Sequence, residues 1–159
     1  MIILLNGSIN SGKSTIAKLL AAKLKDSAVV EIDELRQFIH WMPLPESIPI
    51  NLANAIAVTK VFLGKDLNVI IPYPLSLDNY QYLRDNLQAY TNKFYTFTLS
   101  PTLEVAQSNR GRRQLNDEEM SRIKYHYDAG INNPKFGITL DNSDETPEET
   151  ADKIISLLK

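Results

Sequence analysis

The chain has 159 residues, which fits one domain with a substantial hydrophobic core. Hydrophobic residues make up 43% of it and charged residues 23%, proportions that argue against a disordered chain. The formal net charge of −2 provides no overall basic field for nucleic acid. The absence of cysteine excludes disulfides, thiolate metal sites and thiol catalysis.

The N-terminal apolar run is short and leads directly into a glycine-containing loop, so it does not resemble a secretory signal. No stretch of the sequence approaches the roughly 18 apolar residues that a membrane-spanning helix needs. We therefore expect a soluble, cytoplasmic protein without a membrane partner.

Apolar runs and helical spacing alternate along the chain. Alternation of this kind favours an α/β fold, a parallel sheet covered by helices on both faces, and residues 1–159 are expected to form a single domain. Asn116 and Thr146 are predicted helix N-caps, the latter followed by a proline at the first helical position. Strands are predicted at residues 2–6, 28–32, 67–71, 94–99 and 136–141, and helices at residues 13–25, 51–63, 77–87, 116–129 and from 146.

The segment WMPLPESIPI, residues 41–50, contains three prolines. Because proline disfavours helical geometry at the preceding residue, this segment is predicted to be an extended loop. Such a loop could line a substrate pocket or simply connect two elements, and the sequence leaves both readings open.

The first loop, GSINSGKST, matches the pattern G-x-x-x-x-G-K-[ST] between an apolar strand and an amphipathic helix. Glycines allow the backbone to approach a phosphate closely, and successive N–H groups form an anion nest at the start of the helix. The lysine can reach β- and γ-phosphates and the serine hydroxyl can ligate Mg²⁺, so ATP and Mg²⁺ are the expected cofactors. The predicted phosphate-binding residues are Gly7, Asn10, Ser11, Gly12, Lys13, Ser14 and Thr15.

The end of the second predicted strand reads EIDELR, residues 31–36. Ligands of open parallel sheets lie at the carboxyl ends of the strands, which places Asp33 on the γ-phosphate side. A carboxylate there can accept the proton of an attacking hydroxyl, or it can be a plain helix cap. Arg36, one helical turn later, could hold an anionic or hydroxyl-rich substrate, or be a solvated surface charge.

A second basic cluster, Arg110, Arg112 and Arg113, surrounds Gly111 between two predicted helices. Such a loop can close over a triphosphate, neutralise its charge and exclude water. The alternative is a basic helix C-terminus. RNA binding is less favoured, because the cluster stands alone in an acidic chain.

Together GSINSGKST, EIDELRQFI and LSPTLEVAQSNRGRRQLNDEE resemble the small P-loop kinases, a group that includes shikimate kinase, gluconate kinase, chloramphenicol phosphotransferase and zeta-toxin-like kinases. The resemblance covers most of the chain. It implies a P-loop NTPase fold, with a five-stranded parallel sheet of order 2-3-1-4-5 and a short lid after the fourth strand.

The resemblance also implies roles for individual residues. ATP would be the phosphoryl donor, and Asp33 would lie near the acceptor hydroxyl. Arg110 would be the lid arginine near the adenine or the phosphates, with Arg112 or Arg113 reaching the γ-phosphate. Asn142, in the loop after the last strand, would lie against the adenine.

One departure from the group concerns the third strand, which in many such kinases ends in an acidic residue near Mg²⁺. Here Pro72 stands at that place, so Mg²⁺ is expected to rely on Ser14, phosphate oxygens, water and Asp33. Tyr73 and Trp41 suggest a partly apolar wall of the acceptor pocket, although ordinary packing is the favoured explanation for both.

The sequence thus predicts an ATP-dependent kinase that transfers a phosphoryl group to a hydroxyl of a small molecule. Lys13, Asp33, Arg110 and Arg113 are the predicted catalytic residues, Asp33, Arg36 and Tyr73 the predicted substrate contacts, and Ser14 and Asp33 the predicted metal contacts. Two alternatives remain open, a nucleotide-binding module with little turnover and a nucleic-acid end kinase. His126 is expected on a helix surface, and neither it nor His40 is given a role.

Overall fold

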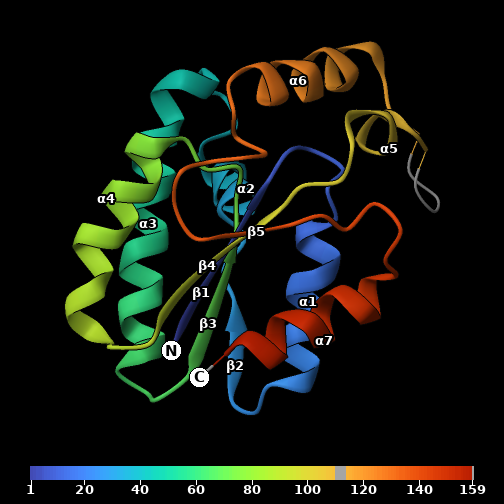
Figure 1. The fold of residues 1–159 in the computed structure, drawn as a ribbon. Helices are drawn as coiled ribbons and strands as arrows, with labels where there is room; N and C mark the ends of the chain where they lie inside the picture. Colours follow the sequence, from blue (N-terminus) through green and yellow to red (C-terminus); the bar gives the residue numbers. More distant parts are fainter. Residues whose placement is uncertain (110–113, 159) are drawn as a thin grey trace.

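A five-stranded parallel sheet forms the centre of the fold (Figure 1). The computed structural model describes residues 1–109 and 114–158. The strand order is β2-β3-β1-β4-β5, which confirms the predicted order and the predicted α/β class. The strands are β1 (Ile2–Gly7), β2 (Ser27–Val29), β3 (Asn68–Pro72), β4 (Phe94–Leu99) and β5 (Ile138–Leu140).

Helices cover both faces of the sheet, with α3 and α4 on one side and α1 and α7 on the other (Figure 1). Asn116 and Thr146 cap α6 and α7 as predicted, and each forms a capping box with the glutamate three residues later. The α-helices are α1 (Lys13–Lys23), α2 (Ile32–Leu35), α3 (Leu44–Leu63), α4 (Leu77–Leu87), α5 (Leu103–Gln107), α6 (Asp117–Asp128) and α7 (Pro147–Leu157), and the 3₁₀ helices are η1 (Arg36–Ile39) and η2 (Gln88–Tyr90).

The central strand β1 is buried along its whole length, because both of its faces are covered. Ile2 and Leu4 point into the core formed with α3 and α4. Ile3 and Leu5 point into the core formed with α1 and α7. Alternate residues of one strand therefore contribute to two separate cores, and this explains why the run is continuously apolar instead of alternating.

The predicted loop at residues 41–50 is wrong for most of its length, since α3 begins at Leu44. Pro45 lies in the first turn, where a backbone N–H has no intrahelical partner in any case. Pro49 lies inside the helix and costs it a hydrogen bond. Burial of Leu52 and Ile56 against the sheet offsets this cost, so the apolar periodicity outweighs the prolines.

The second strand ends three residues earlier than predicted. Ile32 was assigned to this strand because it is apolar, but it begins α2, and its side chain is buried in the core next to α3. Apolar character alone does not distinguish a buried strand residue from a buried helix residue. The shortening places Glu31 and Asp33 at the start of a helix at the carboxyl edge of the sheet.

Asn6, which directly precedes Gly7 at the end of β1, connects four segments at the carboxyl edge of the sheet. Its Nδ2 group donates to Thr98 Oγ1 at 3.0 Å and to the carbonyl of Ile131 at 2.8 Å. Its Oδ1 accepts from the backbone N–H of Leu75 at 2.7 Å. The Asn6 side chain is fully buried. If it is removed, water cannot reach its three partners to replace the lost hydrogen bonds.

We predict that Asn6→Ala lowers the free energy of unfolding by about 2–5 kcal/mol, since it leaves buried backbone and hydroxyl groups unpaired at roughly 1–3 kcal/mol each. Urea unfolding followed by circular dichroism measures the change. Asn86→Ala, which removes one surface hydrogen bond to the carbonyl of Tyr82, is the matched control. Equal effects of the two substitutions would contradict the assigned role of Asn6.

Candidate active site

The loop between β1 and α1 depends on glycine at its first position. Gly7 has φ 142°, and a Cβ on it would lie 2.5 Å from the carbonyl oxygen of Leu99 and 2.6 Å from Ser11 Oγ. Gly12, at the other end of the loop, has φ 98°. Both conformations are strained for residues with a side chain, so the two glycines of the motif are required by the backbone itself.

The amino end of α1 is open to an anion. Gly12 is the N-cap and no side chain of the described residues caps the helix; its first turn also contains no acid. The first backbone N–H groups of the helix thus have no intrahelical acceptor, and the helix dipole places partial positive charge there. The Lys13 ammonium lies over the same loop and donates to the carbonyl of Ser8 at 2.7 Å.

A cavity of about 460 Å³ extends from this loop along the carboxyl edge of the sheet. One end is formed by residues after β2 and the last residue of β3, and the other by the loop after β5 and the start of α7. The lining residues are Ile9, Asn10, Gly12, Lys13, Ser14, Thr15, Ile16, Glu31, Asp33, Pro72, Asn142, Glu145, Pro147 and Thr150.

Glu31 is a residue that the sequence analysis did not assign, and it contacts the loop directly. Its Oε2 accepts a hydrogen bond from Ser14 Oγ at 3.0 Å. Pro72 lies at the end of β3 and lines the cavity, as expected for the position at which an acid is missing. The carboxylate beside Ser14 therefore comes from the segment after the neighbouring strand β2. The sequence feature that could have indicated this contact is the pair of acids at positions 31 and 33.

Asp33 is the second residue of α2 and lies on the cavity wall. Glu31, not Asp33, occupies the N-cap position of this helix. Burial raises the pKa of the Asp33 carboxyl, while the positive charges of Lys13, Arg122 and Arg36 oppose the rise. A carboxylate with a raised pKa accepts a proton more readily than one in water.

Tyr73 and Arg36, two of the predicted substrate contacts, are not among the residues that line the cavity, although both interact electrostatically with Asp33. The Tyr73 side chain is only 7% exposed, and burial together with the nearby Asp33 charge raises the pKa of its hydroxyl to about 12. Arg36 begins η1, one turn after Asp33, and its Nε is buried without a hydrogen-bond partner in the described part of the chain. Trp41, proposed as a further pocket wall, is 73% exposed and does not line the cavity.

The expectation that His126 lies on a helix surface is wrong. It is buried, with 3% of the residue exposed, and its Nδ1 lies 3.3 Å from Ser8 Oγ in the loop. Burial, followed by the charges of Lys13 and Arg122, lowers the pKa of His126 to about 4, so the imidazole is neutral at pH 7. The sequence feature that indicates this burial is the spacing of three residues between Ile123 and His126, which puts both on the buried side of α6.

Asn10 supports the loop from the side of α5. Its φ is 61°, a left-handed conformation that asparagine tolerates, and its Nδ2 donates to the carbonyls of Ala106 and Ser108, at 2.9 Å each. This side chain thus connects the glycine loop to the segment that leads into residues 110–113. Arg110, Arg112 and Arg113, the predicted lid arginines, lie outside the described residues.

Asn142 fixes the opposite end of the cavity. Its Nδ2 donates to the carbonyl of Ser11 at 3.0 Å, and the residue is 3% exposed. The loop after β5 is therefore bound directly to the glycine loop. Asn142 also lines the cavity, next to the start of α7.

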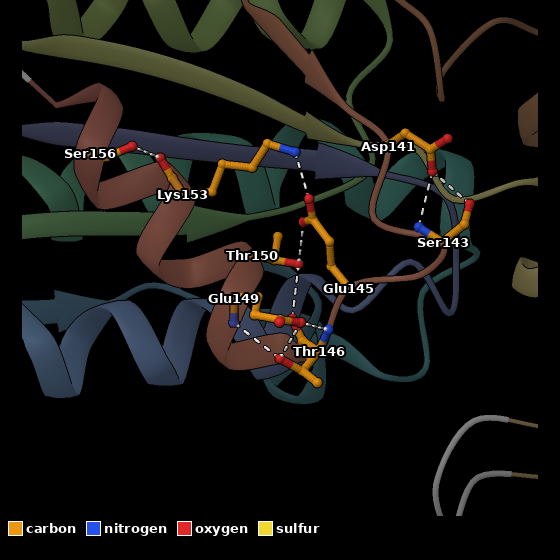
Figure 2. A network of polar contacts seen from close by, with 8 residues as sticks. All are labelled: Asp141, Ser143, Glu145, Thr146, Glu149, Thr150, Lys153 and Ser156. Atoms are coloured by element: carbon orange, nitrogen blue, oxygen red, sulfur yellow. Dashed lines mark hydrogen bonds and ion pairs between the residues drawn. The ribbon is translucent and has the colours of Figure 1, made fainter.

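The start of α7 is held by a network of polar side chains (Figure 2). Glu145 accepts from Thr150 Oγ1 at 3.0 Å and from Lys153 Nζ at 2.5 Å. The capping box of Thr146 and Glu149 completes the first turn of the helix. Because Glu145 and Thr150 also line the cavity, this network gives that wall a defined shape.

The described residues contain no group of three or more histidine and acidic side chains that could hold a metal ion by themselves. No helix within residues 1–109 and 114–158 is long and apolar enough to cross a membrane. A metal at this site would therefore depend on the few oxygen ligands near the loop and on oxygens of a bound ligand.

The fold is that of the small P-loop kinases, as comparison with solved structures shows. No protein-family model and no curated protein matches the sequence. The resemblance noted in the sequence is thus confirmed by solved structures of the group, and at the identities given below these comparisons establish the fold alone.

Three structures illustrate the likeness. The APS kinase of Mycobacterium tuberculosis, solved with AMPPNP and APS, superimposes with a TM-score of 0.74 at 21% identity, covering 99% of this chain and 96% of that one. The shikimate kinase of Aquifex aeolicus gives 0.64 at 20% identity, with coverage of 99% and 96%. The tunicamycin resistance protein of Deinococcus radiodurans gives 0.70 at 18% identity, with coverage of 98% and 94%.

The buried histidine predicts a pH dependence of stability. The pKa of His126 is about 4 in the folded protein and near its ordinary value of 6.5 when unfolded, so the unfolded chain binds the proton more tightly. The contribution of neutral His126 to the free energy of unfolding is fully present above pH 6.5. It is lost as the pH falls toward 4, by up to about 3 kcal/mol.

We expect His126→Gln to remove this part of the pH dependence, measured as the free energy of urea unfolding at steps from pH 7.5 to 4. His40→Gln is the matched control, because His40 is exposed and is the only other histidine of the chain. The assignment is contradicted if the free energy of unfolding of the His126 variant falls between pH 6.5 and 4 as steeply as that of the wild type.

Proposed function

We propose that the protein is an ATP-dependent kinase that transfers the γ-phosphoryl group to a hydroxyl of a small molecule. The observation that carries this proposal is that one cavity contains the open helix end with Lys13, the Ser14–Glu31 pair and the Asp33 carboxylate. The solved structures with the same fold, among them an APS kinase bound to AMPPNP, support it.

The nucleotide would bind with its phosphates against the loop. Lys13 would exchange the carbonyl of Ser8 for the β- and γ-phosphate oxygens, and the backbone N–H groups at the start of α1 would donate to the same phosphates. Asn142 and the start of α7 would face the base. In this arrangement the γ-phosphate points toward Asp33.

The oxygen ligands present suit Mg²⁺, which prefers carboxylate, hydroxyl and water oxygens. Ser14 would contact the ion directly, and Glu31, bonded to Ser14, would hold it through water, with Asp33 nearby. The ion would neutralise charge on the phosphates. In this proposal Glu31 would supply the acid that Pro72 does not, and the hydrogen bond between Glu31 and Ser14 supports catalysis over a binding module with little turnover.

Transfer requires one new bond and one broken bond. The acceptor oxygen attacks the γ-phosphorus, the bond from that phosphorus to the bridging oxygen of ADP breaks, and the hydroxyl proton passes to the Asp33 carboxylate. The products are ADP and a phosphate monoester. The raised pKa of Asp33 suits it to this step, and Tyr73, which stays protonated, can donate a hydrogen bond to the acceptor.

The test of the function is ADP release from Mg·ATP with and without each member of a panel of alcohols. The panel contains hydroxy acids, sugars, nucleosides and hydroxylated antibiotics. Release that depends on an acceptor, together with a phosphorylated product identified by mass spectrometry, supports the kinase. Tight nucleotide binding without stimulated release by any member would favour the binding module.

Asp33→Asn is predicted to reduce kcat by roughly 10²–10⁴-fold, the usual contribution of a general base, with little change in ATP affinity. Lys13→Ala is the contrasting variant, because it is expected to weaken ATP binding itself. Calorimetry for binding and an ADP-release assay for turnover separate the two effects. Full turnover of the Asp33 variant would mean that this side chain only positions its neighbours.

Glu31→Gln is predicted to raise the Mg²⁺ concentration needed for half-maximal activity by roughly tenfold, as expected when a group that orients a metal ligand is changed. Glutamine can still accept the hydrogen bond from Ser14, so the substitution tests the negative charge. Glu34→Gln, a neighbouring exposed glutamate that does not line the cavity, serves as the control. An unchanged Mg²⁺ dependence would limit Glu31 to holding the serine.

A further inference from the structure

A groove of about 560 Å³ lies beside β2, at one edge of the sheet. β2 is an outer strand of three residues, so its far side has no neighbouring strand. The chain then turns into α2 and η1, which pack against α3. The groove lies between these elements, and its apolar lining consists of Val29, Val30, Leu35, Phe38, Val58 and Phe62.

The floor of the groove belongs to the core formed with α3 and α4. Val30 is buried in that core, and Leu35, Val58 and Phe62 pack against it while remaining partly exposed. Phe38 lines the groove and is 80% exposed, so most of its ring is accessible to a ligand. Apolar surface gathered in a groove of this size is typical of a ligand site, because a ligand that covers it removes it from water.

The charged residues of the groove are all negative. Glu31 and Glu34 line it, and within the described part of the chain no lysine or arginine does. The Glu34 side chain is exposed and forms no hydrogen bond or ion pair among residues 1–109 and 114–158. Glu31 already accepts a hydrogen bond from Ser14, so Glu34 is the carboxylate left for a ligand. The charge of the groove is therefore complementary to a cation.

We propose that this groove is a second ligand site, outside the proposed active site, and that it binds an organic cation with an apolar body. The body would cover Leu35, Val58 and Phe62. Its ammonium or guanidinium group would lie beside the Glu34 carboxylate and against the ring of Phe38, where a carboxylate and an aromatic face both attract positive charge. The volume suits a small molecule and is far larger than a bare metal ion needs.

The site differs from the active-site cavity in its chemistry. The cavity contains the open end of α1 and the Lys13 ammonium, which favour an anion, whereas the groove has no such group among its lining residues. Glu31 is the one residue that borders both. The proposal goes beyond the proposed function, because it requires neither nucleotide binding nor turnover.

The test compares two probes by calorimetry at pH 7, 4-phenylbutylamine and the neutral 4-phenylbutanol, which share the same ring and chain length. We expect the amine to bind roughly fivefold more tightly, from one exposed ion pair and one cation–π contact. The titration is repeated with the protein saturated with Mg·AMPPNP. The amine should still bind, because the groove lies outside the cavity that the nucleotide fills.

Two variants assign the binding to the groove. Glu34→Gln is expected to weaken amine binding by roughly threefold and to leave the alcohol unaffected, since it removes only charge. Phe38→Ala is expected to weaken both probes, the amine by roughly threefold or more, since it removes apolar contact as well. Both residues are exposed, so the fold does not depend on them. Glu118→Gln on α6 and Tyr82→Ala on α4 are the matched controls, because both residues are exposed and do not line the groove.

Three results would overturn the proposal. The first is equal affinity for the amine and the alcohol, and the second is amine affinity that neither Glu34→Gln nor Phe38→Ala changes. The third is displacement of the amine by Mg·AMPPNP, which would place the amine in the active-site cavity. A dimer in sedimentation velocity that Phe38→Ala separates would likewise replace the small cation by a second copy of the chain.

Failure of the proposed function is a separate observation. It would show as an absence of AMPPNP binding or of transfer to any alcohol, and the titrations of the free protein and its variants score the groove without either.

Discussion

The site depends on a single close approach, that of Gly7 to the carbonyl of Leu99 on the neighbouring strand β4. No side chain fits there, and the chain can turn out of the central strand only because the residue is glycine. The turn brings the following backbone N–H groups to the carboxyl edge of the sheet. The cavity, the open end of α1 and the position of Lys13 all follow from that turn.

The glycine loop is then held by side chains from distant parts of the chain. His126 of α6 contacts Ser8, Asn142 after β5 binds the carbonyl of Ser11, and Asn10 reaches out to the end of α5. These contacts hold the loop in shape without using the N–H groups at the start of α1. A ligand that binds to this loop would meet a loop that is already formed, which saves the entropy of ordering it.

The glycine turn after β1, the sheet order and the two N-caps could be predicted because each depends on local spacing or on a resemblance carried by a local motif. Two local interpretations failed. Proline at position 49 suggested a loop, although packing of α3 against the sheet outweighs one lost hydrogen bond. His126 was expected on the surface, although it is buried and contacts Ser8 in the loop. Pro72 does end β3 without an acid, and the carboxylate beside Ser14 comes instead from Glu31, after β2.

The sequence by itself determined the elements, the glycine turn and the candidate phosphate-binding groups, because these are set by backbone conformation and by periodicity over a few residues. Only the tertiary structure decided which charged side chains share the cavity. Lys13, Glu31, Asp33 and Glu145 come from segments separated by up to 132 positions, and the fold brings them to one edge of the parallel sheet. Their meeting is a consequence of strand order and helix docking, which no local pattern encodes.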